Sequence, residues 1–584
     1  MIPSLSSNAL TVLQQRYLRK DEQRRVVETP EQLFWRVARN IAAADALYDP
    51  LADVEGLAQR FYRLMASLDF LPNTPTLMNA GAPLQQLSAC FVLPIEDSLE
   101  SIFDTLKNAA LIHQSGGGTG FDFSRLRPRG DVVRTTGGVA SGPVSFLEIF
   151  DAATNAIKQG GTRRGANMGI LRFDHPDVWE FITAKRRPGA ISSFNLSVAV
   201  TDEFMEAVVA GGDVPLINPR TGRQVQVVSA RDIFDSVVEN AWEHGEPGLI
   251  FLDRINADNP TPRLGRLEAT NPCGEQPLLP YESCNLGSIN LAHMLSTENG
   301  RPRLDQARLA ETIGEAIHFL DNVIDANHYP LPQIATICRG NRKIGLGVMG
   351  FADLLIELGI PYDSEQALAF ADEVMRFFAR TAHAASADLA TRRGVFPNYV
   401  GSRFDRPGGP RPRNATVTTV APTGTISIIG GCSSGIEPVF ALSYSRRVLE
   451  GRELVETHPA FLRLAKEHGF YSDDLLDRVT RTGSVQGEPA VPEEVRRVLV
   501  TALDISPEWH VRMQAVFQRH VDNAVSKTVN FPATATQDEV RRVYLLAHRL
   551  GCKGITVYRY GTRERQVLQL HPACPVCSLE GAPA

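Results

Sequence analysis

The sequence predicts an α/β fold that follows a helical N-terminal region. Apolar residues recur at helical spacing over residues 30–44 and 54–66, a pattern typical of amphipathic helices. From Leu71 onward, short β-branched segments alternate with longer helical patterns, which favours an α/β architecture. The strand-like segments are 86–93, 193–200 and 554–558, and the helix-like segments are 99–114, 144–157, 361–391 and 538–550. We therefore expect a helical region at 1–70, one large domain at 71–563 and a flexible tail at 564–584.

The composition is ordinary for a globular protein. The 584 residues are 43% hydrophobic and 22% charged, with a net charge of -6, so nucleic acid and anionic membranes are not expected partners. No apolar run reaches the roughly 18 residues of a membrane span, and the N-terminus lacks a secretory signal pattern. The eight cysteines are sparse and irregularly spaced, which favours the reducing cytoplasm over a disulfide scaffold.

The most informative segment is Asn271-Pro272-Cys273-Gly274-Glu275. If this segment is extended, its amide, thiol and carboxylate side chains point to one face. That set can exchange a proton, abstract or donate a hydrogen, and hold a substrate hydroxyl. The alternative is a buried cysteine in a turn, because Pro272 and Gly274 are turn residues.

Three glycine-containing segments are candidates for binding. Residues 114–120 lack the dinucleotide fingerprint, so their glycines indicate either close approach of a ligand to the backbone or a flexible turn. Residues 158–165 add three basic side chains, which suits a phosphorylated ligand or a solvated basic loop. Residues 421–427 follow the strand-like stretch 415–420 and indicate a phosphate cradle or an ordinary capped turn.

The tail carries a second pair of thiols, Cys574 and Cys577. Two cysteines at this spacing form half of a zinc site, and zinc needs four ligands. His571 is the one further ligand close by in the sequence. The alternative is a dithiol that exchanges with an internal disulfide. We assign no metal-ligating residues.

Taken together, these segments resemble the catalytic subunits of ribonucleotide reductases. The resemblance runs from about residue 71 to residue 568. It rests on an ordered set of motifs: P-N-T-P-T-L-M-N-A-G, S-A-C-F-V-L-P, G-G-G-T-G, K-Q-G-G-T-R-R-G-A-N-M-G, N-P-C-G-E, E-S-C-N-L-G-S-I-N-L and A-P-T-G-T-I-S. The resemblance implies a ten-stranded α/β barrel made of two parallel five-stranded halves that lie antiparallel, with Cys273 on a loop inside.

Within the family the chain is most similar to the adenosylcobalamin-dependent branch, class II. That similarity lies in Y-L-R-K-D-E at 17–22, E-T-P-E at 28–31 and G-C-K-G-I-T-V-Y-R at 551–559. The metal-dependent branch would carry adjacent tyrosines, whereas Arg559 here separates Tyr558 from Tyr560. The first helices also begin too close to Met1 for the usual nucleotide-binding cone. Both departures favour a radical generated by a bound cofactor.

The resemblance implies a role for each catalytic residue. Cys273 becomes a thiyl radical that abstracts the 3′ hydrogen, Glu275 acts as general base and Asn271 holds the sugar hydroxyls. Cys90 and Cys284 supply two electrons and end as a disulfide. The tail pair, Cys574 and Cys577, then reduces that disulfide by exchange, so exchange is favoured over zinc.

The resemblance also implies binding residues and partners. Substrate diphosphate and ribose would contact Thr74, Ala89, Cys90, Gly118, Asn271, Pro272, Cys273, Gly274, Glu275, Pro422, Thr423, Gly424, Thr425 and Ile426. A dNTP or ATP effector at the interface of a homodimer would contact Asp97, Arg127, Lys158, Gln159 and Arg163. We expect a ribonucleoside-diphosphate reductase that serves DNA synthesis and repair and is re-reduced by a thioredoxin-like protein. The alternatives are the large subunit of a metal-dependent reductase and a non-catalytic nucleotide-binding regulator.

Overall fold

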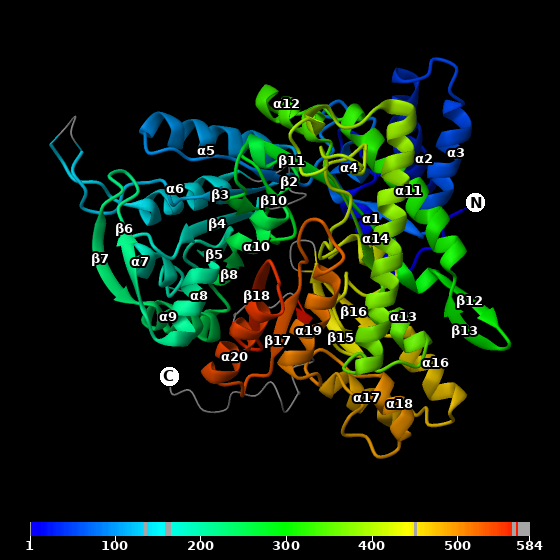
Figure 1. The fold of residues 1–584 in the computed structure, drawn as a ribbon. Coiled ribbons are helices and arrows are strands. Elements are labelled where there is room, and N and C mark those ends of the chain that lie inside the picture. Colours follow the sequence, from blue (N-terminus) through cyan, green and yellow to red (C-terminus); the bar gives the residue numbers. More distant parts are fainter. Residues whose placement is uncertain are drawn as a thin grey trace.

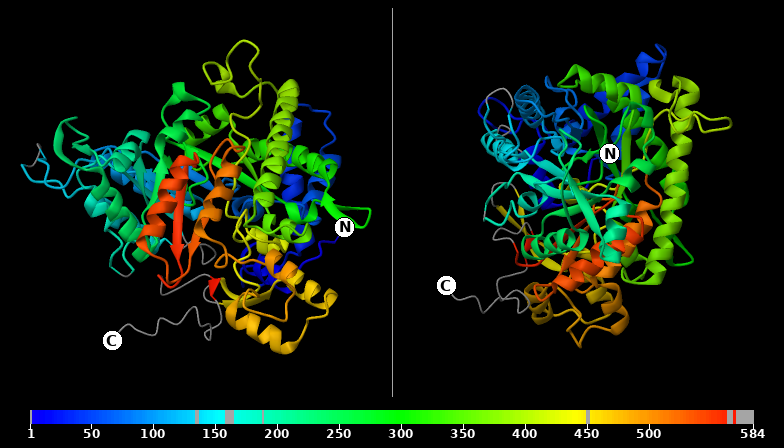
Figure 2. Two further views of the ribbon diagram at one scale, coloured as in Figure 1. Left: turned by 60° about the horizontal axis from the view of Figure 1, so that its bottom comes forward. Right: turned by 60° about the vertical axis from the view of Figure 1, so that its left-hand side comes forward.

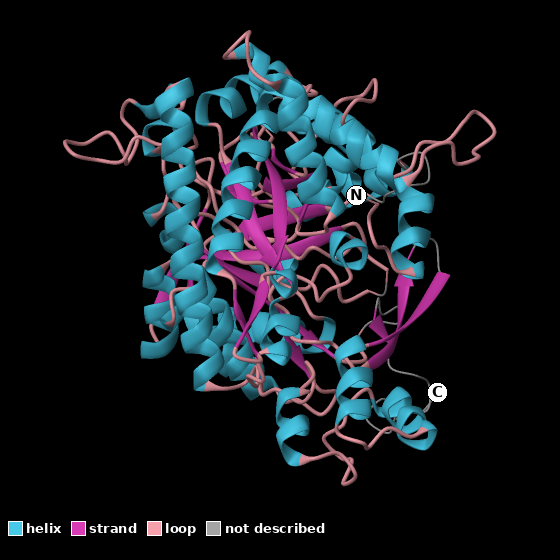
Figure 3. Ribbon diagram, turned by 90° about the vertical axis from the view of Figure 1, so that its right-hand side faces the viewer, coloured by secondary structure: helices cyan, strands magenta, loops and turns pink. Residues whose placement is uncertain are grey.

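A computed structural model describes residues 2–133, 137–157, 165–187, 189–448, 452–562 and 568–569 of the chain. Strands occupy the centre of the molecule and helices surround them (Figures 1 and 3). In the described part of the chain, no helix combines the length and the apolar character needed to cross a bilayer.

The chain begins with helices that pack against one side of the central sheet. These are α1 (Ser7–Arg16), α2 (Pro30–Ala42), the short 3₁₀ helix η1 (Ala43–Leu47) and α3 (Val54–Ala66). Helix α2 starts at Pro30 because Thr29 and Gln32 form a capping box across its first turn, which satisfies two otherwise unpaired amides. Helix α3 matches the predicted range 54–66, and α2 ends two residues before the predicted one.

The first half of the barrel is a set of parallel strands with helical crossovers. In spatial order the strands are β2 (Cys90–Val92), β3 (Gly118–Asp122), β4 (Asn167–Arg172), β5 (Phe194–Val200) and β8 (Gly248–Phe251). The helices between them are α5 (Leu99–Gln114), α6 (Pro143–Ala156), α7 (Val178–Ile182), α8 (Asp202–Ala210) and α9 (Ala230–His244). They cover the outer face of the strands (Figure 2), as parallel strands require.

The second half is also parallel and closes the barrel. Its strands are β11 (Glu282–Asn290), β14 (Ile344–Met349), β17 (Thr528–Phe531) and β18 (Gly554–Arg559), with residues 416–420 between β14 and β17. Parallel bridges join Leu346 to Thr418 and Val420 to Val525. Strand β11 pairs antiparallel with β2, and β18 pairs antiparallel with β8. This arrangement confirms the predicted ten-stranded α/β barrel of two antiparallel halves.

The predicted strand at 415–420 takes part only through isolated bridges in the described residues. The extra strand β1 (Phe70–Pro72) instead adds to the sheet beside β11. Further helices cover the second half: α4 (Thr74–Asn79), α10 (Leu252–Ala257), α11 (Gln306–Ala326), α12 (Pro332–Asn341), α13 (Phe351–Glu357), α14 (Glu365–Arg393), α15 (Ile426–Gly430), α19 (Pro507–Gln518) and α20 (Gln537–Arg549).

Small peripheral units complete the fold. They are the hairpin β6 (Asp213–Ile217) and β7 (Gln224–Ser229), the hairpin β12 (Leu295–Glu298) and β13 (Arg301–Leu304), the sheet β15 (Ser443–Val448), β16 (Arg452–Thr457) and β19 (Leu568–Gln569), and helices α16 (Pro459–Glu467), α17 (Asp473–Thr482) and α18 (Glu493–Val498). In Figure 1 the helices α17 and α18 lie below the barrel.

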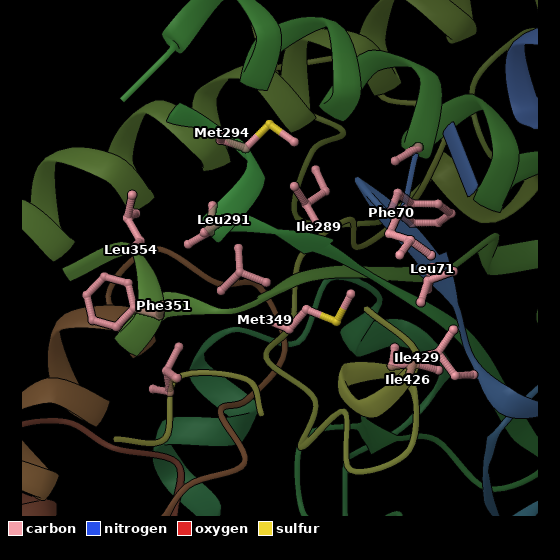
Figure 4. Close-up of a cluster of buried hydrophobic side chains, with 14 of the residues drawn as sticks. Phe70, Leu71, Ile289, Leu291, Met294, Met349, Phe351, Leu354, Ile426 and Ile429 are labelled. Atoms are coloured by element: carbon pink, nitrogen blue, oxygen red, sulfur yellow. The ribbon is translucent and has the colours of Figure 1, made fainter. Parts of the chain in front are cut away.

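A large apolar core anchors the loop that precedes α15. Ile426 and Ile429 of α15 lie in the same buried cluster as Leu71 of β1 and Met349 of β14 (Figure 4). These side chains are at most 7% exposed, and full burial of one such side chain stabilises the fold by about 1.5–3 kcal/mol. The backbone before α15 is therefore fixed against the barrel.

Candidate active site

The Asn271–Glu275 segment forms the tip of a hairpin inside the barrel. Strands β9 (Ala269–Thr270) and β10 (Pro277–Leu278) pair antiparallel below the tip. At the tip the Gly274 amide donates to the Asn271 carbonyl at 3.1 Å, and Gly274 has a φ of 81°. Of the two conformations considered for this segment, the structure has the turn, because Gly274 allows the positive φ that a tight turn requires.

The glycines at 114–120 make room for this hairpin. A Cβ on Gly120 of β3 would lie 1.7 Å from the Thr270 carbonyl oxygen, and one on Gly118 would lie 2.9 Å from Cγ of Pro272. Both distances are too short for a side chain. The glycines thus allow the close approach that the sequence predicts, and what approaches is the chain's own hairpin.

Three contacts hold the hairpin tip in place. The Ala524 amide and the Thr419 hydroxyl each donate to the Glu275 carbonyl at 2.9 Å. Asn195 of β5 donates through Nδ2 to the Pro272 carbonyl at 2.8 Å. No sequence pattern selects Thr419, Ala524 or Asn195, since each lies far from residue 271 along the chain.

Behind the tip, an amide and a carboxylate flank the Cys90 thiol. Asn271 Nδ2 donates to Cys90 Sγ at 3.1 Å, and Cys90 Sγ donates to Glu275 Oε1 at 4.0 Å. The Asn271 orientation is fixed because its Oδ1 accepts from the Gln276 amide at 3.0 Å. Asn271, Glu275 and Cys90 are each at most 3% exposed. Asn271 and Glu275 thus contact the same thiol because of the turn, and not because an extended strand points them to one face.

Cys284 lies directly opposite Cys90 across the β2–β11 pair. Facing residues of antiparallel strands have Cβ atoms about 4.5–5.5 Å apart, which is within reach of a disulfide after a small adjustment. Burial, with a further contribution from the Glu282 carboxylate, raises the pKa of the Cys284 thiol well above its ordinary value. The thiol donates to the carbonyls of Asn285 and Lys343 at 3.4 and 3.6 Å.

Cys273 has the opposite setting, because its side chain is exposed to a cavity. The cavity has a volume of about 430 Å³ and is also lined by Pro272, Pro422 and Tyr558. The next residue, Arg559, is turned away, with its guanidinium 4.2 Å from the Trp242 ring centroid. Its Nε donates to the Trp242 carbonyl at 2.9 Å. Among the described residues that line this cavity, Tyr558 is therefore not followed by a second tyrosine stacked on it.

Of the predicted phosphate residues, Pro422 lines this cavity, whereas Thr74 and residues 423–426 are not part of its described lining. Thr74 begins α4, and its hydroxyl is 2.8 Å from the Tyr17 hydroxyl. Thr423 has a φ of 51° and accepts from the Gly435 amide at 2.8 Å. Arg16 of α1 donates to the Thr425 hydroxyl at 3.3 Å. Arg16 and Tyr17 were not predicted as site residues, although Tyr17 begins one of the motifs that indicated class II.

The remaining predicted substrate residues lie along the same strands. The Ala89 carbonyl accepts from the Gly118 amide at 2.8 Å at the start of β2 and β3. Gly424 is exposed, with open space around it. Ala89 and Gly118 are thus joined directly beside Cys90, which pairs with Gly118 across β2 and β3.

Two family models match this architecture. "Ribonucleotide reductase, all-alpha domain" matches residues 3–85, and "Ribonucleotide reductase, barrel domain" matches residues 88–408 and 412–558. The chain belongs to the ribonucleotide reductase family. The helical region and the barrel are thus those of this family, as the sequence motifs indicated.

Individual relatives of this reductase agree with the family assignment. A "vitamin B12-dependent ribonucleoside-diphosphate reductase" of Mycobacterium tuberculosis is 55% identical over 97% of this chain and 80% of its own length. A protein of the same name from Thermoplasma acidophilum is 50% identical, again over 97% of this chain and 80% of its own length. The solved alpha subunit of a class Id reductase from Actinobacillus ureae superposes with a TM-score of 0.76 at 24% identity, covering 95% of this chain and 97% of that one. That likeness shows the fold.

The predicted effector residues of this reductase are only partly described. Asp97 and Arg127 are brought together, with Arg127 Nε 2.8 Å from Asp97 Oδ2. Both side chains are about one quarter exposed, at 24% and 25%. Lys158, Gln159, Arg163, Cys574 and Cys577 lie outside the described residues.

Proposed function

We propose that this chain is a vitamin B12-dependent ribonucleoside-diphosphate reductase, which makes 2′-deoxyribonucleotides with adenosylcobalamin as the radical source. The observation that carries the proposal is the exposed Cys273 on the hairpin tip, directly in front of the Asn271, Cys90 and Glu275 contacts. The names of relatives 50–55% identical support it. The product would serve DNA synthesis and repair.

The proposed chemistry follows from where each group lies. A thiyl radical at Cys273 takes the 3′ hydrogen, and Glu275 accepts the proton of the 3′-hydroxyl while Asn271 holds the sugar. The 2′-hydroxyl then leaves as water. Cys90 and Cys284 together give up two electrons and two protons and form one disulfide, which balances the reduction. The contact between Cys90 and Glu275 gives the thiol proton a direct acceptor.

The cavity next to Cys273 fits the reactive part of the cofactor. Adenosylcobalamin, when bound, supplies a carbon-centred radical by homolysis of its cobalt–carbon bond. The volume of the cavity, about 430 Å³, is in the range of small-molecule sites. Aromatic and polar side chains, including Phe440, Tyr558 and Asn530, line it. These residues would orient the group and exclude water around the Cys273 thiol.

The partners of the reductase are part of the proposal. The substrate phosphates would bind at Thr74 and the 422–426 loop, and a dNTP or ATP effector would bind near Asp97 and Arg127. A homodimer is supported by apolar side chains on neighbouring helices α5 and α6, where Leu99, Phe103, Leu111 and Ile149 are 39–65% exposed. Exposed apolar groups of this kind mark interaction surfaces.

The proposed cycle also needs a tail and a reductant. A thioredoxin-like protein would reduce Cys574 and Cys577, and these would exchange with the Cys90–Cys284 disulfide. This organisation corresponds to a helical region at 1–70, a catalytic barrel at 71–563 and a redox tail at 564–584. The sparse cysteines support a cytoplasmic protein.

One assay tests the proposal. The purified chain is supplied with a ribonucleoside diphosphate, a small dithiol and adenosylcobalamin as the sole cofactor, and the deoxynucleotide is measured. We expect turnover without a second protein. Turnover that requires an added metal-containing subunit would contradict the proposal and favour the large subunit of a metal-dependent reductase.

A further inference from the structure

Cys273 lies between two different chemical environments. On one side are Asn271, Cys90 and Glu275, and on the other is the cavity of about 430 Å³. Of the predicted substrate residues, only Pro272, Cys273 and Pro422 belong to the described lining of that cavity. The cavity is therefore a separate compartment, and its own polar groups indicate what it binds.

The cavity wall contains a buried lysine whose donors are all used. Lys527 has a side chain 0% exposed and forms an ion pair with Glu437. Its ammonium also contacts His510 Nδ1 at 2.8 Å and donates to the Thr528 carbonyl at 2.7 Å. An ammonium has three donors, so Lys527 holds Glu437 in place and has none left for a ligand.

The Glu437 carboxylate, by contrast, has acceptor capacity left. It is 25% exposed, and it accepts from Lys527 and from the Thr528 amide at 2.7 Å. A carboxylate offers about four acceptor sites, so about two remain toward the cavity. These acceptor sites favour a ligand with two adjacent hydroxyl donors over an ionised phosphate, whose oxygens are acceptors only.

The rest of the wall suits a nucleoside. Phe440 and Tyr558 offer aromatic surfaces for a base, and Met168 offers a polarizable apolar contact. The cavity's second carboxylate, Glu246, is less accessible, because it is 7% exposed, pairs with Lys185 at 2.8 Å and accepts from the Leu196 amide at 2.9 Å.

We propose that Glu437, held by Lys527 and His510, is the subsite that binds the 2′,3′-diol of a nucleoside beside Cys273. This deepens the proposed function, on which it rests: the nucleoside is the adenosyl group of the cofactor. Glu437 and Cys273 line the same cavity, so a ribose held by Glu437 would lie in the compartment to which the Cys273 thiol is exposed. Burial lowers the pKa of both Lys527 and His510, and the Glu437 carboxylate opposes the shift at Lys527. The lowered pKa favours a neutral His510, whose Nδ1 accepts from the Lys527 ammonium.

The test uses nucleosides as probes and does not depend on turnover. Iodoacetamide modification of Cys273 is followed by peptide mass spectrometry with adenosine or 2′,3′-dideoxyadenosine present. We expect adenosine to protect Cys273 at a concentration roughly tenfold lower or better. Glu437→Gln should reduce this preference to less than about twofold. Its melting temperature should fall, because the buried Lys527 loses its charged partner. Protection is therefore measured below that temperature and relative to the unprotected modification rate of the same variant.

Glu246→Gln is the matched control, because it removes the other carboxylate of the same cavity. It should keep the preference for adenosine. Loss of the preference in Glu246→Gln with retention in Glu437→Gln would overturn the assignment, as would equal protection by both nucleosides in the unaltered chain. Adenosine bound on the Asn271 side would be insensitive to Glu437→Gln, which also overturns it.

A parallel turnover assay separates this inference from the proposed function. If the unaltered chain turns over with adenosylcobalamin but Glu437→Gln still prefers adenosine, only the subsite assignment is wrong. If Glu437 governs the preference but no turnover occurs with the cofactor, the reductase proposal fails and the nucleoside site remains.

Discussion

The proposed radical thiol and the proposed reducing thiols are held in opposite ways. Cys273 is on a hairpin tip and is exposed to a cavity, whereas Cys90 and Cys284 lie within paired strands and are 3% and 1% exposed. A loop tip can present one sulfur to two compartments. A strand pair cannot do that, but its register sets two sulfurs directly opposite each other. The difference shows that exposure to the cavity determines where Cys273 lies, whereas the distance between the two sulfurs determines where Cys90 and Cys284 lie.

Removing the tip thiol should have the largest effect. Cys273→Ala should abolish turnover with any reductant, because neither strand thiol faces the cavity. The measurement is deoxynucleotide formation with a small dithiol. Cys552→Ala, which removes a buried thiol that has no role in the proposal, serves as the control and should retain turnover. Residual turnover in Cys273→Ala would refute the radical role.

Reduction of the Cys90–Cys284 disulfide should be separable from the chemistry at Cys273. Replacing both Cys574 and Cys577 by Ser should preserve turnover with a small dithiol and abolish it with a thioredoxin-like protein, because a protein donor cannot enter the barrel. Both assays are run on the same preparation. Equal loss with the two donors would show that the tail does not serve as the shuttle.

Displacing the hairpin should reduce the activity that depends on Cys273 while leaving Cys90 and Cys284 able to form a disulfide. In Gly120→Ala the new Cβ meets the Thr270 carbonyl at 1.7 Å, so the hairpin must move. We expect a loss of about 1–3 kcal/mol in the free energy of unfolding and a fall in kcat on the order of 100-fold. Disulfide formation between Cys90 and Cys284, measured by thiol titration, should persist.

The control for this variant is Gly314→Ala, in the interior of α11 with open space around its Cβ. It should raise the free energy of unfolding by about 0.5–1 kcal/mol, since Ala favours a helix over Gly. If Gly120→Ala is as stable and active as this control, the close approach of hairpin and β3 does not constrain the site.

The smallest expected effect is a loss of folding stability in alkaline solution, caused by the buried thiols. Burial raises the pKa of Cys338 and Cys552 from 9.0 to about 12, and that of Cys284 well above 9.0. Below pH 9 these thiols are protonated in the folded and unfolded chain alike, and their contribution to stability is complete. Above it the unfolded chain releases protons that the folded chain retains, so stability falls as pH rises toward 12.

Thermal unfolding between pH 8 and 11 measures this decline. Cys552→Ala should make the decline shallower, because it removes one of the buried thiols. A decline as steep in Cys552→Ala as in the unaltered chain would show that this thiol does not contribute to it.

The sequence predicted the barrel and the residues of the site better than it predicted how they meet. Helices α3 and α5 match their predicted ranges because local periodicity determines them. The number of strands followed from the resemblance, since local patterns alone predicted only an α/β architecture. The turn at the tip was predicted as one of two conformations, and periodicity alone could not choose between them.

Contacts between distant segments were beyond local reasoning. Ala524 and Asn195 hold the tip through single hydrogen bonds to backbone carbonyls, and backbone partners leave no mark in the sequence of either segment. Lys527, Glu437 and His510 were missed for a related reason. A buried charged pair is visible only when burial is known.

The two strand thiols belong to different halves of the barrel, and the tip lies in the chain between those halves. Cys90 is in β2, Cys284 is in β11, and the hairpin follows β8. During synthesis on the ribosome, the first half emerges with one sulfur and no partner for it. The antiparallel pairing of β8 with β18, which closes the barrel, can form only after β18 has emerged, near residue 559. A truncated chain that stops earlier would therefore carry the thiols without the closed chamber in which a radical is shielded from solvent.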